Sequence, residues 1–341
     1  MLIFRWLAFL ALAFYATIGL SLPPPPGKPP VRSYGMDEYG GHLTNWVVRQ
    51  APDQRIVVGG GDGLVIFDGA NWQTIRSRHR NRIRVMEIDP SGRIWIGSSD
   101  EFGYFDPGQD GGLVYHSLSD RLPEELRDFG EIRGLHQIGD AIYFHALRHL
   151  FRWQDDELQT VQASDGLFRI TLNHQHRLLV LIRDRFHEYT DFPADGQAPP
   201  PADGWSMPEG PRLSMLASWS DGRILMGSVD DGLFWLSEDG PVAIETDFEL
   251  AGTWPYQAIP APDGGILLAT QQAGLFHLGT NGEALEQITH RNGLAVNSIY
   301  DLIIDHENGV WLAQGGAIAR VDLFGGRRIY DADFGLATTN A

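Results

Sequence analysis

The sequence repeats one pattern of short apolar runs and turns about every 42 residues, and this period constrains the fold more than any other feature. Each copy has an apolar run, a turn rich in Asp, Gly or Asn, a second apolar run that ends near glycine, and a third that follows Gly-Leu. The clearest copy is Ser91–Gly97. Seven copies are marked by Gln54, Gly92, Asp140, His176, Gly222, Gly264 and Gly309.

The composition of the copies indicates strands. Asp-Gly and Asn-Gly pairs separate the apolar runs because these residues adopt the positive φ that a tight hairpin needs. No long stretch has the 3.6-residue period of a helix, and each copy has room for four strands. We therefore predict an all-β fold, a seven-bladed β-propeller of four-stranded antiparallel blades, with most tryptophans packed between blades. Third strands are expected at Gly63–Asp68, Leu150–Trp153, Gly232–Leu236 and Gly274–Leu278, and outer strands at Trp72–Ile75 and Glu286–Thr289.

The copies resemble the sensor repeats of the two-component regulator propeller family. The best match is Gly293–Tyr300, continued through Trp311–Ala313, and Trp95 also keeps the tryptophan of that family. The resemblance covers residues 31–341. It implies an extracytoplasmic, ligand-sensing propeller that binds glycan-derived oligosaccharides. It also implies a membrane span and a histidine kinase, diguanylate cyclase or DNA-binding output that lie outside these 341 residues.

The N-terminus has the pattern of a secretory signal peptide. Arg5 precedes the uncharged run Trp6–Leu20, and small residues stand before a cut at Leu22. We predict a signal peptide over 1–21 and a stiff Pro-rich linker over 22–30, the alternative being an uncleaved anchor. No later stretch has the 18 apolar residues that a membrane helix needs. The product is therefore expected in the periplasm or outside the cell.

The two ends of the repeat region indicate how the ring closes. Val31–Tyr34 and Arg327–Tyr330 both read as outer strands, which is one more than seven blades require. Phe334–Ala341 resembles the opening of another repeat. We predict a propeller domain over 31–341, closed by Val31–Tyr34, at the front of a longer sensor whose next part is a signalling domain or a second propeller. A homodimer is left open.

Charge and cysteine content exclude several functions. The chain has a formal net charge of −18, which argues against nucleic acid as a partner, since such binding rests on a basic surface. It has no cysteine, so disulfides, thiolate metal sites and cysteine nucleophiles are excluded. Lys28 is the only lysine, so nearly every cation is an arginine.

The candidate binding residues lie in loops that a propeller gathers around one end of its channel. Arginine pairs with carboxylate or sulfate in a bidentate manner, and aromatic rings there could stack on a sugar. The alternative is that these arginines only neutralise neighbouring Asp and Glu. The candidates are Trp46, Arg82, Arg133, Arg148, Arg169, Arg183, Arg185, Trp254 and Tyr256.

No pattern in the sequence predicts a catalytic residue, a metal site or a cofactor. His145 and His149 lack the Glu of a zincin helix, and His174 and His176 lack a third ligand nearby. Gly59–Gly63 lacks the Lys of a phosphate-binding loop. The main hypothesis is a non-enzymatic sensor for a small or oligosaccharide ligand, either neutral or anionic. The alternatives are a secreted propeller enzyme, a lyase or metal-dependent lactone hydrolase, and a protein-interaction propeller.

Overall fold

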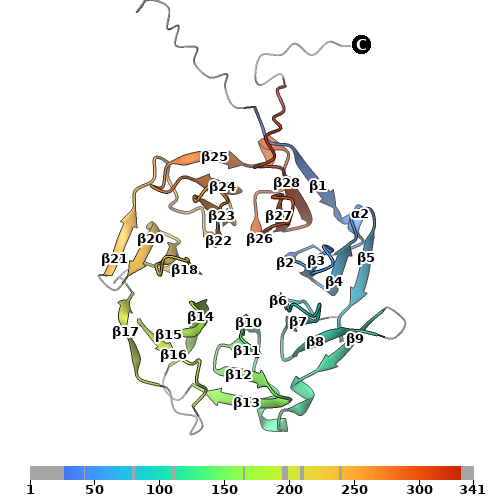
Figure 1. Cartoon of the computed structure of the whole chain (residues 1–341), viewed down its shortest axis with the longest axis vertical. Coiled ribbons are helices and arrows are strands. Elements are labelled where there is room, and N and C mark those ends of the chain that lie inside the picture. Colours follow the sequence, from blue (N-terminus) through green and yellow to red (C-terminus); the bar gives the residue numbers. More distant parts are fainter. Residues whose placement is uncertain are drawn as a thin grey trace, which may run out of the picture. The chain divides into compact units, whose positions relative to one another are not determined.

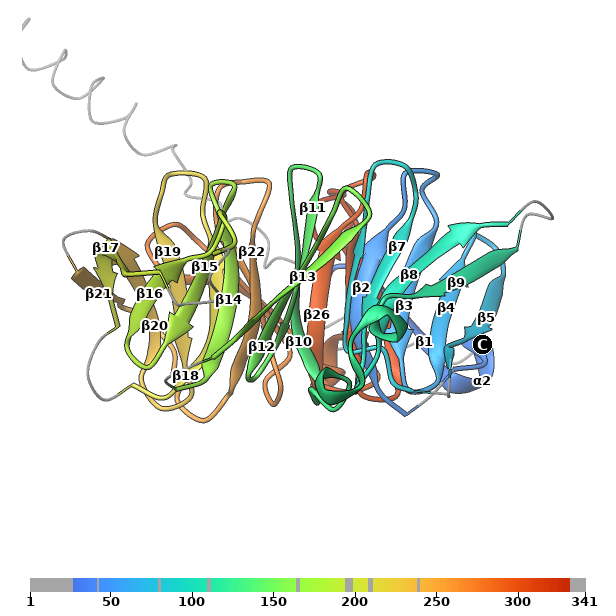
Figure 2. The ribbon, with the colours of Figure 1, turned by 90° about the horizontal axis from the view of Figure 1, so that it is seen from below.

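The computed structural model describes residues 27–41, 43–78, 81–108, 112–163, 166–193, 199–207, 211–237 and 240–331. Between Val31 and Gly325 the strands form seven separate four-stranded antiparallel sheets around a central channel (Figures 1 and 2). The predicted seven-bladed propeller is therefore confirmed. The predicted signal peptide and the start of a further repeat at 334–341 lie outside the described residues.

In each of blades 1 to 6 the strands run in chain order from the channel outward. Blade 1 consists of β2 (Asn45–Gln50), β3 (Ile56–Gly60), β4 (Gly63–Phe67) and β5 (Trp72–Arg76). Blade 2 consists of β6 (Val85–Ile88), β7 (Ile94–Gly97), β8 (Phe102–Pro107) and β9 (Leu113–Ser117). Blade 3 consists of β10 (Ile132–Ile138), β11 (Ala141–Ala146), β12 (His149–Gln154) and β13 (Glu157–Gln162). Blade 4 consists of β14 (Phe168–His174), β15 (Arg177–Ile182), β16 (Arg185–Glu188) and β17 (Pro201–Ser206). Blade 5 consists of β18 (Leu213–Ser218), β19 (Ile224–Ser228), β20 (Gly232–Ser237) and β21 (Gly240–Ile244). Blade 6 consists of β22 (Pro255–Pro260), β23 (Ile266–Thr270), β24 (Leu275–Leu278) and β25 (Ala284–Ile288).

Blade 7 is built from both ends of the propeller. It contains β26 (Ile299–Ile304), β27 (Val310–Gln314) and β28 (Ala317–Val321), and its outer strand is β1 (Val31–Gly35), which pairs with β28 from Val31↔Val321 to Gly35↔Ala317. The N-terminal segment thus closes the ring, as the surplus outer strand predicted. The expectation that Arg327–Tyr330 forms an outer strand is wrong. The edge of β28 is already occupied by β1, and Ile329 instead makes an isolated bridge with Lys28.

Helices are few among the described residues, as the lack of helical periodicity predicts. They are α2 (Met36–Tyr39) and three single 3₁₀ turns at Ser119–Arg121, Glu124–Leu126 and His290–Asn292. None of the described helices has the length and apolar character to cross a bilayer.

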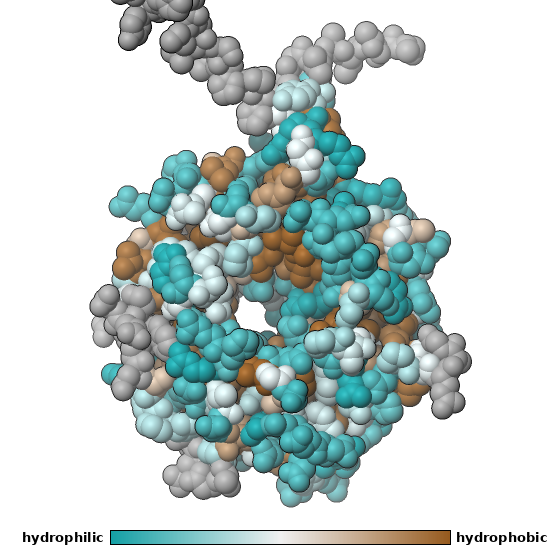
Figure 3. Space-filling view, in the orientation of Figure 1, coloured by the Kyte–Doolittle hydropathy of each residue, from teal (hydrophilic) through white to brown (hydrophobic). Residues whose placement is uncertain are grey.

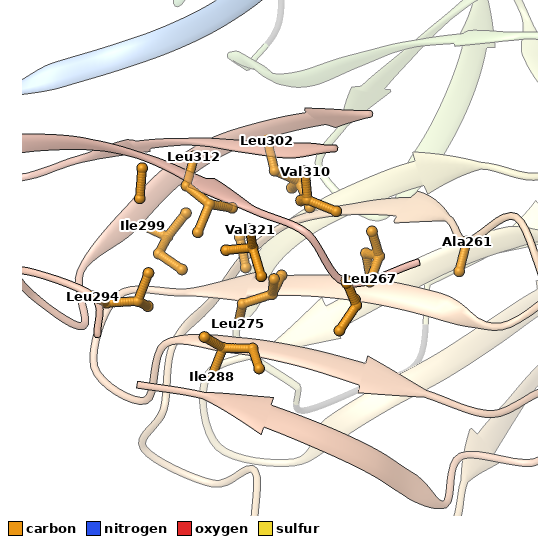
Figure 4. Packing of buried hydrophobic residues seen from close by; sticks show 13 residues of the cluster. Ala261, Leu267, Leu275, Ile288, Leu294, Ile299, Leu302, Val310, Leu312 and Val321 are labelled. Carbon is orange, nitrogen blue, oxygen red and sulfur yellow. The ribbon is translucent and has the colours of Figure 1, made fainter. Parts of the chain in front are cut away.

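The core consists of apolar layers between neighbouring blades. Figure 4 shows one such layer, in which Leu267 and Leu275 of blade 6 pack with Leu312 of blade 7. The glycine that ends a second strand permits this approach. A Cβ at Gly97 would lie 2.4 Å from Cγ2 of Ile132 in the next inner strand, so the glycines near strand ends are needed for blade contact.

The two repeats that keep the family tryptophan use it in the same way. Trp311 Nε1 donates to Asp305 in the preceding turn at 2.9 Å, and Trp95 Nε1 donates to Asp89 at 3.1 Å. Both indoles are buried. Because a buried N–H needs an acceptor, each aspartate fastens its turn to the face of its own blade.

Candidate functional site

The inner strands share one irregularity near their first residues. In six blades the pairing of the inner strand with its neighbour shifts by one residue, leaving one unpaired residue at the shift. A bulge of this kind re-aims a side chain and is common beside functional sites. In blade 2 Arg84 holds the same place, where its N–H donates to Gly97 O beside the Val85–Gly97 pair. In blade order, these residues are Trp46, Arg84, Arg133, Arg169, Ser214, Tyr256 and Tyr300, and we call them the mouth ring.

The mouth ring surrounds one end of the central channel, whose opening is visible in Figure 3. All seven inner strands line a cavity of about 420 Å³ in this channel, and every member of the mouth ring except Arg169 contributes to its wall. The volume lies in the range of small-ligand sites, which is roughly 300–1,000 Å³. Five bulged residues and Arg84 thus bring side chains from six blades around one ligand-sized space.

Three aromatic residues and an arginine form a connected cluster at this mouth. The ring centroids of Trp46 and Tyr300 lie 4.5 Å apart, and those of Tyr300 and Tyr256 lie 5.5 Å apart at 82°. The guanidinium carbon of Arg84 lies 4.1 Å from the Trp46 centroid, and Arg84 Nη2 donates to the Tyr256 hydroxyl. Burial raises the pKa of Tyr256, and nearby Arg84 opposes this shift. Arg84 thus links blade 2 to blades 1 and 6.

The charges at the mouth are incompletely balanced. Arg82 and Arg133 share one carboxylate, that of Glu131, at 2.7 and 3.9 Å. Within the described part of the chain, no carboxylate lies within ion-pair distance of Arg84. The mouth therefore has more arginine than acid, although the whole chain is strongly acidic.

Deeper in the channel the charges are paired. Arg49 on β2 donates to Asp301 on β26 at 2.6 Å and to both oxygens of Glu87 on β6, at 3.1 and 3.3 Å. Burial raises the pKa of Asp301 despite the adjacent guanidinium. His136 Nε2 lies 2.8 Å from Thr171 Oγ1, and burial lowers the pKa of this histidine to about 4, so it is neutral at pH 7. These carboxylates already have a partner within the protein.

The nine predicted candidates separate into several places. Trp46, Arg133 and Tyr256 line the channel cavity. Arg169 lies on the mouth ring but outside the cavity, and it donates to the Arg183 carbonyl at 2.8 Å. Arg82 stands beside the mouth, with its guanidinium 6.0 Å from the Trp46 ring.

The remaining candidates lie away from the channel. Arg183 and Arg185 line a separate surface hollow of about 500 Å³ on blade 4, together with Pro199–Pro201. Arg148 is exposed in the loop between β11 and β12. Trp254 is exposed at the rim, has φ of +58° and lies under Arg212, whose guanidinium is 5.6 Å from the ring.

Sequence reasoning missed three members of the mouth ring, Arg84, Ser214 and Tyr300, as well as the Arg49–Asp301 pair. Each member of the mouth ring directly follows a residue that is apolar and buried in most of the seven blades, as Arg84 follows Ile83. Aligning the starts of all seven inner strands would have grouped these residues. Selection by loop position alone cannot distinguish them from neighbours on the same face.

The histidines are packed separately. His145 Nε2 lies 2.8 Å from the Phe168 carbonyl, and His174 Nδ1 lies 3.0 Å from Ser218 Oγ. His149 is buried and stacks on Phe151. Among the residues with described positions, no three His, Asp or Glu side chains are grouped to hold a metal ion.

The sequence matches no family model and no curated protein. Solved structures share the fold at low identity. Virginiamycin B lyase from Staphylococcus aureus matches with a TM-score of 0.66 and 10% identity over 86% of this chain and 99% of the lyase.

Two sensor structures match as well. They are extracellular domains of the "putative hybrid two component system" proteins BT4673 and BT3049 from B. thetaiotaomicron, with TM-scores of 0.64 and 0.65 and identities of 18% and 13%. The matches cover 86% and 87% of this chain but 39% and 42% of those chains, so this chain spans about two fifths of their length. These likenesses agree with the resemblance of the repeats to the two-component regulator family, and they establish that the chain is a β-propeller with the fold that such sensors share with lyases.

Proposed function

We propose that this chain is the extracytoplasmic, ligand-sensing propeller of a signal-transduction receptor of the hybrid histidine kinase or diguanylate cyclase type. The observation that carries the proposal is the mouth ring, where bulges aim aromatic and arginine side chains into one ligand-sized cavity. The sensor ectodomains with the same fold support this role.

The chemistry of the channel favours binding over catalysis. Glu87 and Asp301, its two lining carboxylates, hold Arg49, and His136 is hydrogen-bonded to Thr171. In contrast, Trp46 and Tyr300 offer aromatic surface to a sugar-like ring, and Arg84 and Arg133 offer hydrogen-bond donors. Aromatic rings with a few polar groups are the usual composition of a recognition site.

Isothermal titration calorimetry of the purified protein against neutral and acidic oligosaccharides tests this function. Trp46→Ala should weaken binding of any ligand found at least about tenfold, because it removes the largest apolar surface at the mouth. Trp254→Ala is the matched control and should leave the affinity unchanged, since Trp254 lies outside the cavity. The proposal fails if no oligosaccharide binds or if the two variants have equal effects.

The fate of the ligand separates a sensor from an enzyme. Mass spectrometry of the ligand after overnight incubation with the protein should return it intact. Conversion to a lyase or hydrolase product that Trp46→Ala abolishes would instead assign this mouth to catalysis.

Export through the predicted signal peptide is part of the proposal. N-terminal sequencing of the periplasmic protein should begin at Leu22, whereas a sequence beginning at Met1 in the membrane fraction would indicate an uncleaved anchor.

A further inference from the structure

We propose that the ligand of this mouth is anionic: a ring compound of sugar size whose carboxylate or sulfate pairs with Arg84. This inference rests on the proposed function and specifies the chemical class that the same site takes.

The order of residues around the mouth ring divides it into two arcs. Blades 6, 7 and 1 contribute Tyr256, Tyr300 and Trp46, whereas blades 2, 3 and 4 contribute Arg84, Arg133 and Arg169; Ser214 of blade 5 lies between the arcs. A ligand seated across this mouth meets aromatic rings on one side and Arg133 on the other, and the guanidinium of Arg84 lies against the aromatic arc. Such a division fits a molecule with a ring face and a negative group.

Arg84 joins the two arcs. Its side chain extends from blade 2 to the hydroxyl of Tyr256 and passes 4.1 Å from the Trp46 centroid. A guanidinium has five N–H donors, and among the described residues its side-chain hydrogen-bond acceptor is the Tyr256 hydroxyl. Several donors are therefore available to a ligand at a half-buried position.

The contrast with Arg49 shows what Arg84 lacks. Arg49 lies further down the same channel and is neutralised by Glu87 and Asp301. Arg84 has aromatic neighbours and a phenol in place of carboxylates. An arginine pairs with a planar carboxylate or with a sulfate through two parallel hydrogen bonds, so an anionic ligand supplies the partner that the protein does not.

Arg133 is expected to contribute less than Arg84. Its side chain is 50% exposed and already lies 3.9 Å from Glu131. Exposed ion pairs are screened by water and salt and contribute little. Affinity for the negative group should therefore depend mainly on one residue.

Calorimetry with matched ligand pairs tests the inference. The probes are oligosaccharides of glucuronate against those of glucose, and a sulfated disaccharide against its unsulfated form, each at low and at 0.5 M salt. Acidic members should bind about tenfold more tightly or better, with the difference reduced at high salt. The two acidic series distinguish a carboxylate ligand from a sulfate ligand.

Substitutions locate the anion. Arg84→Gln should weaken acidic ligands about 10- to 100-fold and neutral ones little, as expected for loss of a charge-assisted pair. Arg84→Lys keeps the charge without the planar fork and should have an intermediate effect. Arg148→Gln, an exposed arginine outside the cavity, is the matched control and should have no effect. Unchanged thermal unfolding of each variant verifies its fold.

The outcomes separate this inference from the proposed function. Equal affinity for acidic and neutral members, or an Arg84→Gln variant that keeps the acidic preference, overturns the anionic ligand while the sensor stands. If no member of either series binds, both proposals fail. Loss of the preference for acidic ligands in Arg148→Gln would overturn the assignment to Arg84 and place the anion-binding site in the β11–β12 loop of blade 3.

Discussion

Replacing Asp305 by alanine is the most informative test of how a blade is held together. This carboxylate is only 5% exposed and accepts four hydrogen bonds. The donors are the N–H groups of Glu307 and Gly309, Trp311 Nε1 and Arg320 Nε, at 2.9, 2.7, 2.9 and 2.8 Å. Asp305→Ala leaves the buried indole N–H without this acceptor, and it removes the buried carboxylate from Arg320, which keeps its hydrogen bond to the exposed Glu307.

The expected cost is about 4 kcal/mol of the free energy of unfolding, since removing one partner of a buried charged pair costs roughly 3–5 kcal/mol. The propeller has about 300 residues and an unfolding entropy near 0.6 kcal/mol/K, so the Tm should fall by about 6 °C. Urea denaturation and differential scanning calorimetry at pH 7 measure the two quantities.

Glu307→Ala is the matched control in the same turn. Its carboxylate is 66% exposed, and its hydrogen-bond partner among the described residues is Arg320 Nη2, at 3.0 Å, so the loss should be below about 1 kcal/mol. An Asp305→Ala variant as stable as Glu307→Ala would refute the assignment of Asp305 as the anchor of this turn.

The destabilisation caused by Asp305→Ala should depend on pH. Burial raises the pKa of Asp305, but the hydrogen bonds from Arg320, Gly309 and Trp311 outweigh it and hold that pKa below its usual value. A carboxyl with a lowered pKa stabilises the fold above pH ~4 and loses this contribution as the pH falls further. The difference in the free energy of unfolding between the parent protein and Asp305→Ala should therefore become smaller toward pH 3.

Three other substitutions or conditions give independent predictions. Gly97→Ala should destabilise the propeller by about 1–3 kcal/mol in urea denaturation, because its Cβ would overlap the next inner strand; an unchanged midpoint would contradict the packing described. Arg49→Met should lower the free energy of unfolding by about 3–5 kcal/mol at pH 8. The loss should shrink as the pH falls, because burial raises the pKa of the Asp301 carboxyl and favours its neutral form; a loss that does not change with pH would count against this. Burial lowers the pKa of His136 and of His145 to about 4, so stability should fall between pH 6.5 and 4, by up to about 2–3 kcal/mol for each, and His136→Gln should reduce that fall in acid titrations of unfolding.

The propeller was predictable because its information is local and repeated. Turn residues such as Gly92, which has φ of +87°, identify the hairpins, and similar turn residues recur between the apolar runs of the other copies. Ring closure by Val31–Gly35 followed from counting outer strands. The sequence did not show that Arg327–Tyr330 forms no outer strand. Val31–Gly35 and Arg327–Tyr330 both have the pattern of an outer strand, and local pattern does not indicate which of them pairs with β28.

The mouth was only partly predictable. Loop position selected Trp46, Arg133 and Tyr256, which line the channel cavity near the starts of their inner strands. It could not separate them from Arg148 or Trp254, since the position of a residue within its loop does not show whether it lies at the start of an inner strand, where most of the pairing irregularities occur. Asp301 gave no signal as an isolated acid in an apolar strand; its role depends on Arg49, which is distant in sequence.

A crystal structure of the protein with its tightest-binding acidic oligosaccharide tests the central claim most directly. We predict a sugar ring against Trp46 and Tyr300, with the carboxylate or sulfate about 3 Å from the Arg84 guanidinium nitrogens. A ligand in the blade 4 hollow beside Arg183 and Arg185, with the channel mouth empty, would contradict it.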